Sequence, residues 1–277
     1  MNKLNLKIPH YCKLKDRKKL IDNQLINIKN KNVIYNVEFY LKYDKEEIDD
    51  KIINEFFDLN LKEWNRRAKI SIQKNTSVKR KITKGEMSLI MKSLNIWKNI
   101  IDDNLDFCLI VEDDTCFIDN FTNKYLDCIN NFPIDWDIIY INLEYVKDNE
   151  VKPIFKDVKS RRIYNMRKNI KEIDTKLVNL NKEINKNNSN EHFTLITQGQ
   201  KWKYGYGYII KKETAEKFYK TLIRKKCVLP IDMEIGYLIE KHKLKCYFYN
   251  QNLVYQNLHI KSSLSPKRKL ARKGLLK

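Results

Sequence analysis

Glycine and proline are scarce in this chain, which has six glycines and five prolines among its 277 residues. That composition argues against repeats, collagen-like segments and Gly-rich phosphate-binding loops. Long apolar runs are also missing. The apolar runs have the length of a strand, as in Phe107–Val111, whereas a membrane-spanning helix needs ~20 apolar residues. The first residues lack the apolar core of a signal peptide, so we expect a cytoplasmic globular protein.

Cysteine spacing typical of metal or redox sites is absent too. The six cysteines form no Cys-X-X-Cys pattern and no mixed Cys/His zinc pattern. We interpret them as free thiols in a reducing compartment.

Negative charge is in deficit, because 55 Lys and Arg face 35 Asp and Glu and leave a net charge of +20. Such a charge attracts polyanions: nucleic acid, an anionic membrane surface or phosphorylated small molecules. The lysines are spread over every segment, however, and Asn and Ile are also abundant. The charge therefore has two interpretations, a compositional bias and a polyanion-binding surface.

Helical and strand patterns alternate along the chain, which predicts an α/β fold. Residues 8–43 have a strand, helix, strand pattern whose helix covers 15–28 and whose second strand covers 33–41. Further helices are expected at 45–62, 84–101, 117–132, 213–224 and 230–241, and further strands at 107–111, 137–143, 206–210 and 246–249. Thr83 and Glu86 resemble a capping box that opens the helix at 84–101.

The composition changes between residues 147 and 201, where Lys, Asn, Glu and Ile dominate. We expect a helical, partly mobile insertion there. The main domain then covers 1–266, and 267–277 form a basic tail.

Three acids, Glu112, Asp113 and Asp114, directly follow the apolar run 107–111. Ligands gather at the carboxyl ends of strands in open α/β sheets, and clustered carboxylates suit Mg²⁺ or Mn²⁺ that also hold substrate phosphates. If the backbone is extended, the side chains of residues 112 and 114 project to the same side. The alternative is a solvated turn in which Asp113 or Asp114 caps the next helix.

Other candidates are less specific. Asp232 and Glu234 could supply a general base, or Asp232 could cap a helix that begins after Pro230. His259 could join a carboxylate-bound Mn²⁺, or be an ordinary surface histidine. Gly205 belongs to Gly205-Tyr206-Gly207, whose glycines allow the backbone to approach a ligand or a neighbouring strand closely.

Several motifs occur in a defined order along residues 8–264. They are Asp16-Arg17, Gly85-Glu86-Met87-Ser88-Leu89 with Trp97, Cys108 to Asp114, Trp136 to Tyr140, Tyr208-Ile209-Ile210 with Ala215, Pro230-Ile231-Asp232, and Leu253 to Gln256. This set resembles glycosyltransferase family 25, which includes bacterial lipooligosaccharide and collagen galactosyltransferases. Two positions depart from the pattern. Lys92-Ser93 stands where the family has Ser-His, and the Asn of the family's first-strand Ile-Asn-Leu has no counterpart around His10 to Leu14.

The resemblance implies a glycosyltransferase A-type, Rossmann-like fold and an inverting, metal-dependent transfer of galactose or glucose from a UDP-sugar to a glycan or protein hydroxyl. The metal would be Mn²⁺ or Mg²⁺. By this resemblance Asp114, Glu112 and His259 are candidate metal ligands, Asp232 and Glu234 are candidate bases, and Arg17, Glu86, Glu112, Asp113, Gly205 and Tyr208 are candidate donor contacts. Arg17 could equally form an ion pair with Asp16 or a later acid.

A second hypothesis is a catalytically decayed transferase fold that binds a polyanion, either nucleic acid or an anionic surface. Its basis is the charge of +20, the missing helix histidine and the basic insertion. On the primary hypothesis we expect no specific nucleic acid partner, although peripheral contact with an anionic membrane is compatible with it.

Overall fold

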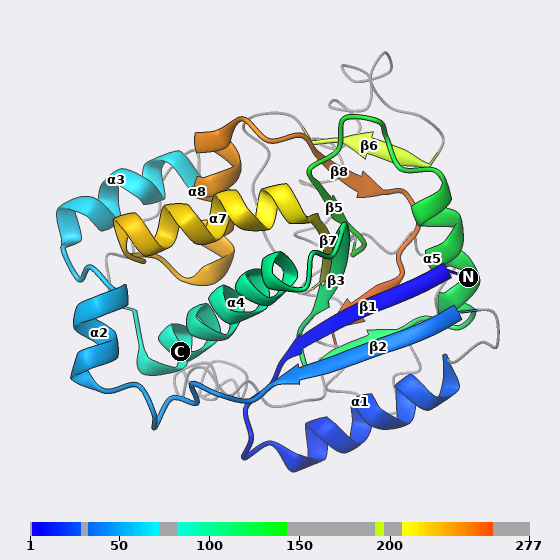
Figure 1. The fold of residues 1–277 in the computed structure, drawn as a ribbon, viewed down its shortest axis with the longest axis horizontal. Helices are drawn as coiled ribbons and strands as arrows, with labels where there is room; N and C mark the ends of the chain where they lie inside the picture. Colours follow the sequence, from blue (N-terminus) through cyan, green and yellow to red (C-terminus); the bar gives the residue numbers. More distant parts are fainter. Residues whose placement is uncertain (1, 29–32, 72–81, 143–191, 197–206, 257–277) are drawn as a thin grey trace, which may run out of the picture.

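A mixed seven-stranded sheet forms the centre of the molecule (Figure 1). The computed structural model describes residues 2–28, 33–71, 82–142, 192–196 and 207–256. The strand order is β2-β1-β3-β7-β5-β8-β6. The strands are β1 Asn2–Pro9, β2 Val33–Tyr40, β3 Phe107–Val111, β5 Ile138–Tyr140, β6 Phe193–Leu195, β7 Gly207–Lys211 and β8 Cys246–Tyr249.

Three strands at one side of the sheet run in the same direction, because β1 pairs in parallel with both β2 and β3. The next strand, β7, is antiparallel to β3 and to β5. A separate two-stranded sheet joins β4 Thr115–Phe117 to β9 Val254–Gln256. The carboxyl ends of β1, β2 and β3 therefore share one edge, to which the acidic triplet belongs.

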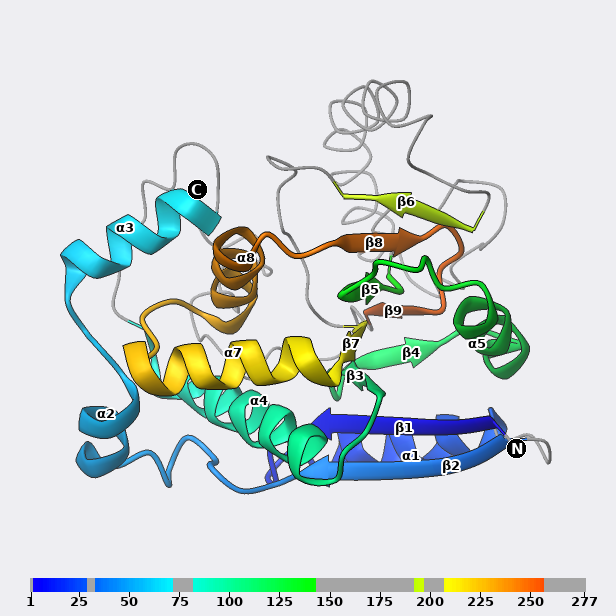
Figure 2. The same ribbon diagram turned by 45° about the horizontal axis from the view of Figure 1, so that its top comes forward.

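Helices cover both faces of the sheet (Figure 2). One face packs against α4 Lys84–Asp102, α7 Lys212–Lys225 and α8 Ile231–His242, with α2 Asp50–Phe56 and α3 Leu61–Ser71 farther out. The other face packs against α1 Lys15–Asn27 and α5 Phe121–Asn130. Along β3 the side chains alternate between these cores: Cys108 and Ile110 face the first, Leu109 and Val111 the second.

The predicted α/β class with a mixed central sheet is confirmed. The capping box is confirmed as well, since the Thr83 side chain accepts from Glu86 N and Glu86 Oε2 accepts from Thr83 N at 2.9 Å. The expected insertion at 147–201 lies almost wholly, and the tail entirely, outside the described residues, apart from the short strand β6. None of the described helices is both long and apolar enough to cross a membrane.

Two expected helices have different bounds. A single helix over 45–62 is wrong, because α2 ends at Phe56 and α3 begins at Leu61. Between them the side chains of Asp58 and Asn60 accept from backbone N–H groups two residues on, which favours a turn over a continuous helix. The helix expected from 117 begins only at Phe121, because residues 115–117 form β4.

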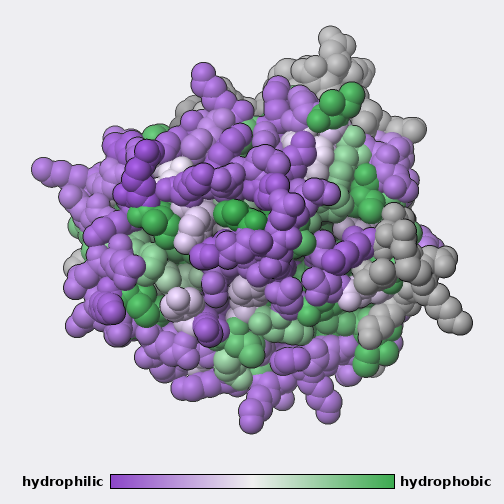
Figure 3. All heavy atoms as spheres, in the orientation of Figure 1, coloured by the Kyte–Doolittle hydropathy of each residue, from purple (hydrophilic) through white to green (hydrophobic). Residues whose placement is uncertain are grey.

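Polar side chains cover most of the face seen in Figure 3, with apolar side chains exposed only in patches between them. This distribution agrees with a chain whose lysines are spread over every segment. The surface charge alone therefore does not single out one site.

Candidate functional site

The acidic triplet lies in a tight turn and not in an extended strand. Thr115 N donates to the carbonyl of Glu112 at 3.1 Å, which closes a turn between β3 and β4. The expectation that residues 112 and 114 project to one side required an extended backbone, and it is wrong for this reason. The capping alternative is also wrong, because the next helix begins at Phe121 and has Asn120 as its N-cap.

Asp113 is bound by two side chains from the segment that follows β1, at the same edge of the sheet. His10, directly after β1, lies with Nδ1 2.8 Å from Asp113 Oδ2, and Arg17 of α1 donates to Asp113 Oδ1 at 2.5 Å. All three side chains are buried. Burial pushes the pKa of Asp113 up, but the bonds from His10 and Arg17 outweigh it and keep that pKa below its ordinary value.

Arg17 is thereby assigned to the ion-pair interpretation. Its second acidic neighbour is Asp114, whose Oδ2 lies 3.7 Å from Nη1. One guanidinium therefore faces two carboxylates of the triplet. Its predicted contact with a donor stays a prediction, because the ion pair does not test it.

Glu112 directly follows β3 and is partly buried. Burial raises its pKa to about 8, and the charges of Asp114, Asp113 and Asp232 add to the rise. Asp232 comes from α8, 120 positions farther along the chain, so the fold brings the second predicted acidic motif close to the first. Among the described residues that act on Glu112, three carboxylates raise its pKa and one guanidinium, that of Arg17, lowers it.

Tyr208 and Tyr140 lie on the neighbouring strands β7 and β5, and both belong to the core that packs against α4, α7 and α8. Tyr208 pairs across the sheet with Ile110 and with Tyr140. Burial raises the pKa of both tyrosines; Glu112 adds to the rise at Tyr208 and Asp232 at Tyr140. The structure thus brings Tyr208, a predicted donor contact, near Glu112, although the ring itself is buried.

Asp232 and Glu234 have opposite surroundings. Asp232 is exposed in the first turn of α8, and Pro230, not Asp232, is the N-cap residue. Glu234 is completely buried, where its Oε1 accepts from the backbone N–H groups of Val228 and Leu229 at 2.6 and 2.9 Å and its carboxylate pairs with Arg67 at 3.3 Å. The geometry argues against Glu234 as a base, because no acceptor hydroxyl can reach a carboxylate enclosed in this way.

Of the remaining predicted site residues, Glu86 is among the described residues, whereas Gly205 and His259 are not. Glu86 is half-buried in its capping box at the start of α4. The adjacent Gly207 confirms a close approach between strands, since a Cβ there would lie 2.7 Å from Val254 Cγ2.

A resident divalent ion is compatible with part of this arrangement. In the described part of the chain, no three His, Cys, Asp or Glu side chains form a ready-made metal site. Mg²⁺ is usually bound by one or two carboxylates together with substrate phosphates, and carboxylates suit Mn²⁺ as well. Glu112 and Asp114 fit that pattern, because their mutual repulsion, which helps to raise the pKa of Glu112, is what a divalent cation would offset.

Sequence reasoning missed two buried polar residues around the site. His10 gave only one signal, its position directly after a strand in which polar and apolar residues alternate. Lys92 lies on the buried face of α4 and donates at 2.8 Å to the carbonyls of Leu41 and Lys42 and to Asp44. A lysine among apolar helix positions was the available signal. Lys92 fixes the loop that follows β2. The family's histidine falls on the next residue, Ser93, whose hydroxyl donates to the carbonyl of Leu89 at 2.8 Å.

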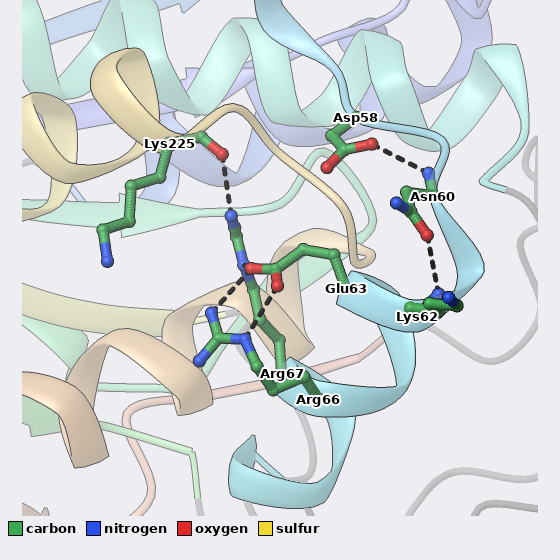
Figure 4. Close-up of a pocket in the computed structure, with 7 residues that line it drawn as sticks. All are labelled: Asp58, Asn60, Lys62, Glu63, Arg66, Arg67 and Lys225. Atoms are coloured by element: carbon green, nitrogen blue, oxygen red, sulfur yellow. Dashed lines mark hydrogen bonds and ion pairs between the residues drawn. The ribbon is translucent and has the colours of Figure 1, made fainter.

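Two hollows on the surface of the described part of the chain are relevant to the charged groups. One, of about 470 Å³, opens beside the site and is lined by His10, Cys12, Lys15, Lys18, Lys19, Asp22 and Asn23. The other, of about 420 Å³, lies at α3 and the end of α7 (Figure 4). Of these two hollows, only the first is lined by a residue that contacts the acidic turn, namely His10.

Comparisons with known proteins identify the family of this chain. A family model described as Glycosyltransferase family 25 (LPS biosynthesis protein) matches residues 12–235. Procollagen galactosyltransferase 2 of Mus musculus is 29% identical over 140 residues, which are 50% of this chain and 21% of the relative. The Homo sapiens protein of the same name is 31% identical over 74 residues, 26% of this chain and 12% of the relative. The chain therefore matches only about a fifth or less of these relatives.

A solved structure was also found, the apo form of mouse Xyloside xylosyltransferase 1. It has a TM-score of 0.42 and 9% identity, and the match covers 88% of this chain and 84% of that chain. The family match is more informative, because it includes the acidic turn, Arg17 and Asp232 in one continuous region. It confirms the family predicted from the motifs and, with it, the glycosyltransferase class: the chain belongs to glycosyltransferase family 25.

Proposed function

We propose that this protein transfers a hexose, galactose or glucose, from a UDP-sugar to a hydroxyl group of a glycan or protein acceptor, with inversion at the anomeric carbon. The observation that supports it is the surplus of carboxylates at the shared edge of β1 and β3, where Glu112, Asp114 and Asp232 lie near one another. The collagen-modifying names of the relatives are compatible with a hydroxylated protein acceptor.

The acidic residues divide the work between them. Glu112 and Asp114 would hold Mn²⁺ or Mg²⁺, which when bound offsets the charge that develops on the departing diphosphate. Asp113 positions the turn through its bonds to His10 and Arg17. Lys15, Lys18 and Lys19 line the adjoining hollow, where their charges suit the phosphates of a donor.

Asp232 is the proposed general base. It is exposed, it comes from a helix on the far side of the turn from α1, and it lies near Glu112. In an inverting displacement the base must lie opposite the leaving group, so the carboxylates that hold the metal cannot fill that role. An ionised Asp232 within hydrogen-bond reach of the acceptor hydroxyl would take its proton.

The direct test is UDP release from a panel of UDP-sugars, with and without Mn²⁺ and with glycan or hydroxylated peptide acceptors. Mn²⁺-dependent release with UDP-galactose or UDP-glucose is the expected result. Salt-sensitive binding of nucleic acid without any sugar turnover would contradict the proposal and favour the polyanion-binding hypothesis.

A further inference from the structure

A second charged cluster surrounds Tyr237, near the middle of α8, and extends to Lys241 in the last turn of that helix. Arg67 lies with its guanidinium carbon 5.1 Å from the centre of the Tyr237 ring, and Lys241 Nζ lies 5.9 Å from it. Arg66 shares a hydrogen bond with the Tyr237 side chain. Because α8 rises ~1.5 Å per residue, Lys241 is roughly 14 Å along the helix axis from Asp232.

Cations outnumber carboxylates in this cluster. Glu63 accepts from both Arg66 and Arg67 at 2.6–2.7 Å, as Figure 4 shows, and Glu234 is already paired with Arg67. The carboxylates of the cluster and its adjoining hollow are Asp58, Glu63 and Glu234, and the cations are Lys62, Arg66, Arg67, Arg224, Lys225 and Lys241. Three of these positive charges therefore have no matching negative charge here.

Lys241 gives the most specific evidence for a missing anion in this cluster. Its Nζ is buried and has no hydrogen-bond acceptor among the residues that the structure describes. The charged groups that act on it are those of Lys225, Arg224 and Arg67, which are cations and donors like itself. Burial lowers the pKa of Lys241 to about 8, and Lys225, Arg224 and Arg67 add to that effect.

Helix geometry explains only part of this arrangement. Lys225 ends α7 and Lys241 lies in the last turn of α8, where helix dipoles favour cations. The helix dipole does not require one ammonium group to be buried near other cations. Burying a cation in such surroundings costs free energy unless an anion compensates its charge. Lys225 is one of the residues that line the hollow of about 420 Å³, together with Lys62, Arg66 and Arg67, so an anion in that hollow would lie beside four cations.

From these contacts we propose that the Tyr237 cluster is a binding site for a phosphate group, separate from the transferase site. Lys225 and Lys241 would donate to it from adjacent helices, with Lys62 and Arg66 at the mouth of the hollow. A phosphate is a dianion with several acceptor oxygens, so it can accept from two or more of these donors at once. The phosphate could be free or part of a phosphorylated sugar.

Lys241→Met provides the test, because the proposal predicts opposite effects with and without ligand. In phosphate-free buffer the variant should melt at a higher temperature than the unchanged protein, since a crowded buried charge is removed. Titration with inorganic phosphate at constant ionic strength should stabilise the unchanged protein and bind the variant at least about tenfold more weakly. Lys225→Gln, which keeps the backbone carbonyl bound by Arg67, should lose affinity similarly.

Two controls locate the effect. Lys51→Gln removes one exposed charge from α2, and Lys3→Gln removes one from β1, away from both hollows. Both should retain the phosphate affinity of the cluster. Glucose 6-phosphate serves as the second probe: binding as tight as that of inorganic phosphate supports a phosphorylated sugar, and weaker binding supports free phosphate. The proposal is overturned if phosphate stabilises the protein no more than chloride, or if either control loses as much affinity as Lys241→Met.

Discussion

Two buried arginine–carboxylate pairs, Arg67 with Glu234 and Arg17 with Asp113, occupy opposite regions of the molecule. Both acids are buried and both ion pairs involve a guanidinium Nη1. Around Glu234 the carboxylate is fully engaged, by two backbone N–H groups and by Arg67, and the surplus charge nearby is positive. Around Asp113 the surplus is negative, because Glu112, Asp114 and Asp232 lie close by.

The difference shows that a buried ion pair is weak evidence for a functional site and that the uncompensated charge around it is stronger evidence. Glu234 has all the partners it needs within the protein, so nothing is left for a ligand to supply. Within the part of the chain that the structure describes, carboxylates outnumber cations at the acidic turn, so a cationic ligand would be stabilised there. The following predictions test that distinction, beginning with the largest effect.

Asp114→Asn should reduce sugar transfer to the limit of detection, because the charge that would help to hold a divalent ion is lost while the side-chain volume is kept. Mn²⁺-dependent UDP binding should weaken with it. Asp119→Asn, an exposed acid farther along the same segment, is the matched control and should retain activity. Near-full activity in a folded Asp114→Asn protein would refute the metal assignment.

Asp232→Asn should slow transfer by about 10²–10⁴-fold, the usual cost of losing a general base. UDP and Mn²⁺ affinity should change little, because the proposed base faces the acceptor. Glu240→Gln, near the other end of α8, is the control for a changed charge on that helix. Loss of UDP binding in the Asp232 variant would place the residue with the donor, and full retention of both rate and binding would leave it no catalytic role.

Much of this architecture could be predicted from local sequence signals. The apolar run before Glu112 predicts a buried strand. The apolar periodicity of α4, together with Thr83 and Glu86, predicts a capped helix. Both elements were predictable because their signals come from residues that are close together in the sequence. The break between α2 and α3 was missed because the apolar stripe continues across it. The turn residues Asp58 and Asn60 were the overlooked signal.

The site was less predictable because its contacts are distant in sequence. His10 and Arg17 meet Asp113 across 103 and 96 positions, which no spacing rule links. The separation of Asp232 from Glu234 could have been inferred, however. Residues two apart on a helix point to roughly opposite sides, so a helical 230–241 already implies that only one of them faces the acidic turn.

Glu234→Gln should lower the free energy of unfolding by about 3 kcal/mol, the lower end of the range for breaking a buried ion pair, because Glu63 still pairs with Arg67. Transfer per folded molecule should stay unchanged. Denaturant unfolding and transfer assays at a temperature where the variant is folded separate the two effects. If the folded variant is instead slowed 10²-fold or more, Glu234 acts in catalysis and the contrast between the two regions fails.

The smallest expected effect is a pH dependence of stability that comes from Lys241. Its pKa is about 8 in the folded protein, below the ordinary value of 10.5, with Lys225 and Arg224 of α7, Arg67 of α3 and Tyr237 of its own helix around it. Between these two pKa values the unfolded chain binds more protons, so stability should rise with pH from about 8 to 10.5.

Lys241→Met should remove this rise, whereas Lys51→Gln should keep it. Melting temperatures of the three proteins, measured across that range without phosphate, would show it as a difference between the curves. Identical curves for Lys241→Met and Lys51→Gln would mean that Lys241 titrates as an ordinary surface lysine, and the positive surplus around Tyr237 would then be smaller than the contacts imply.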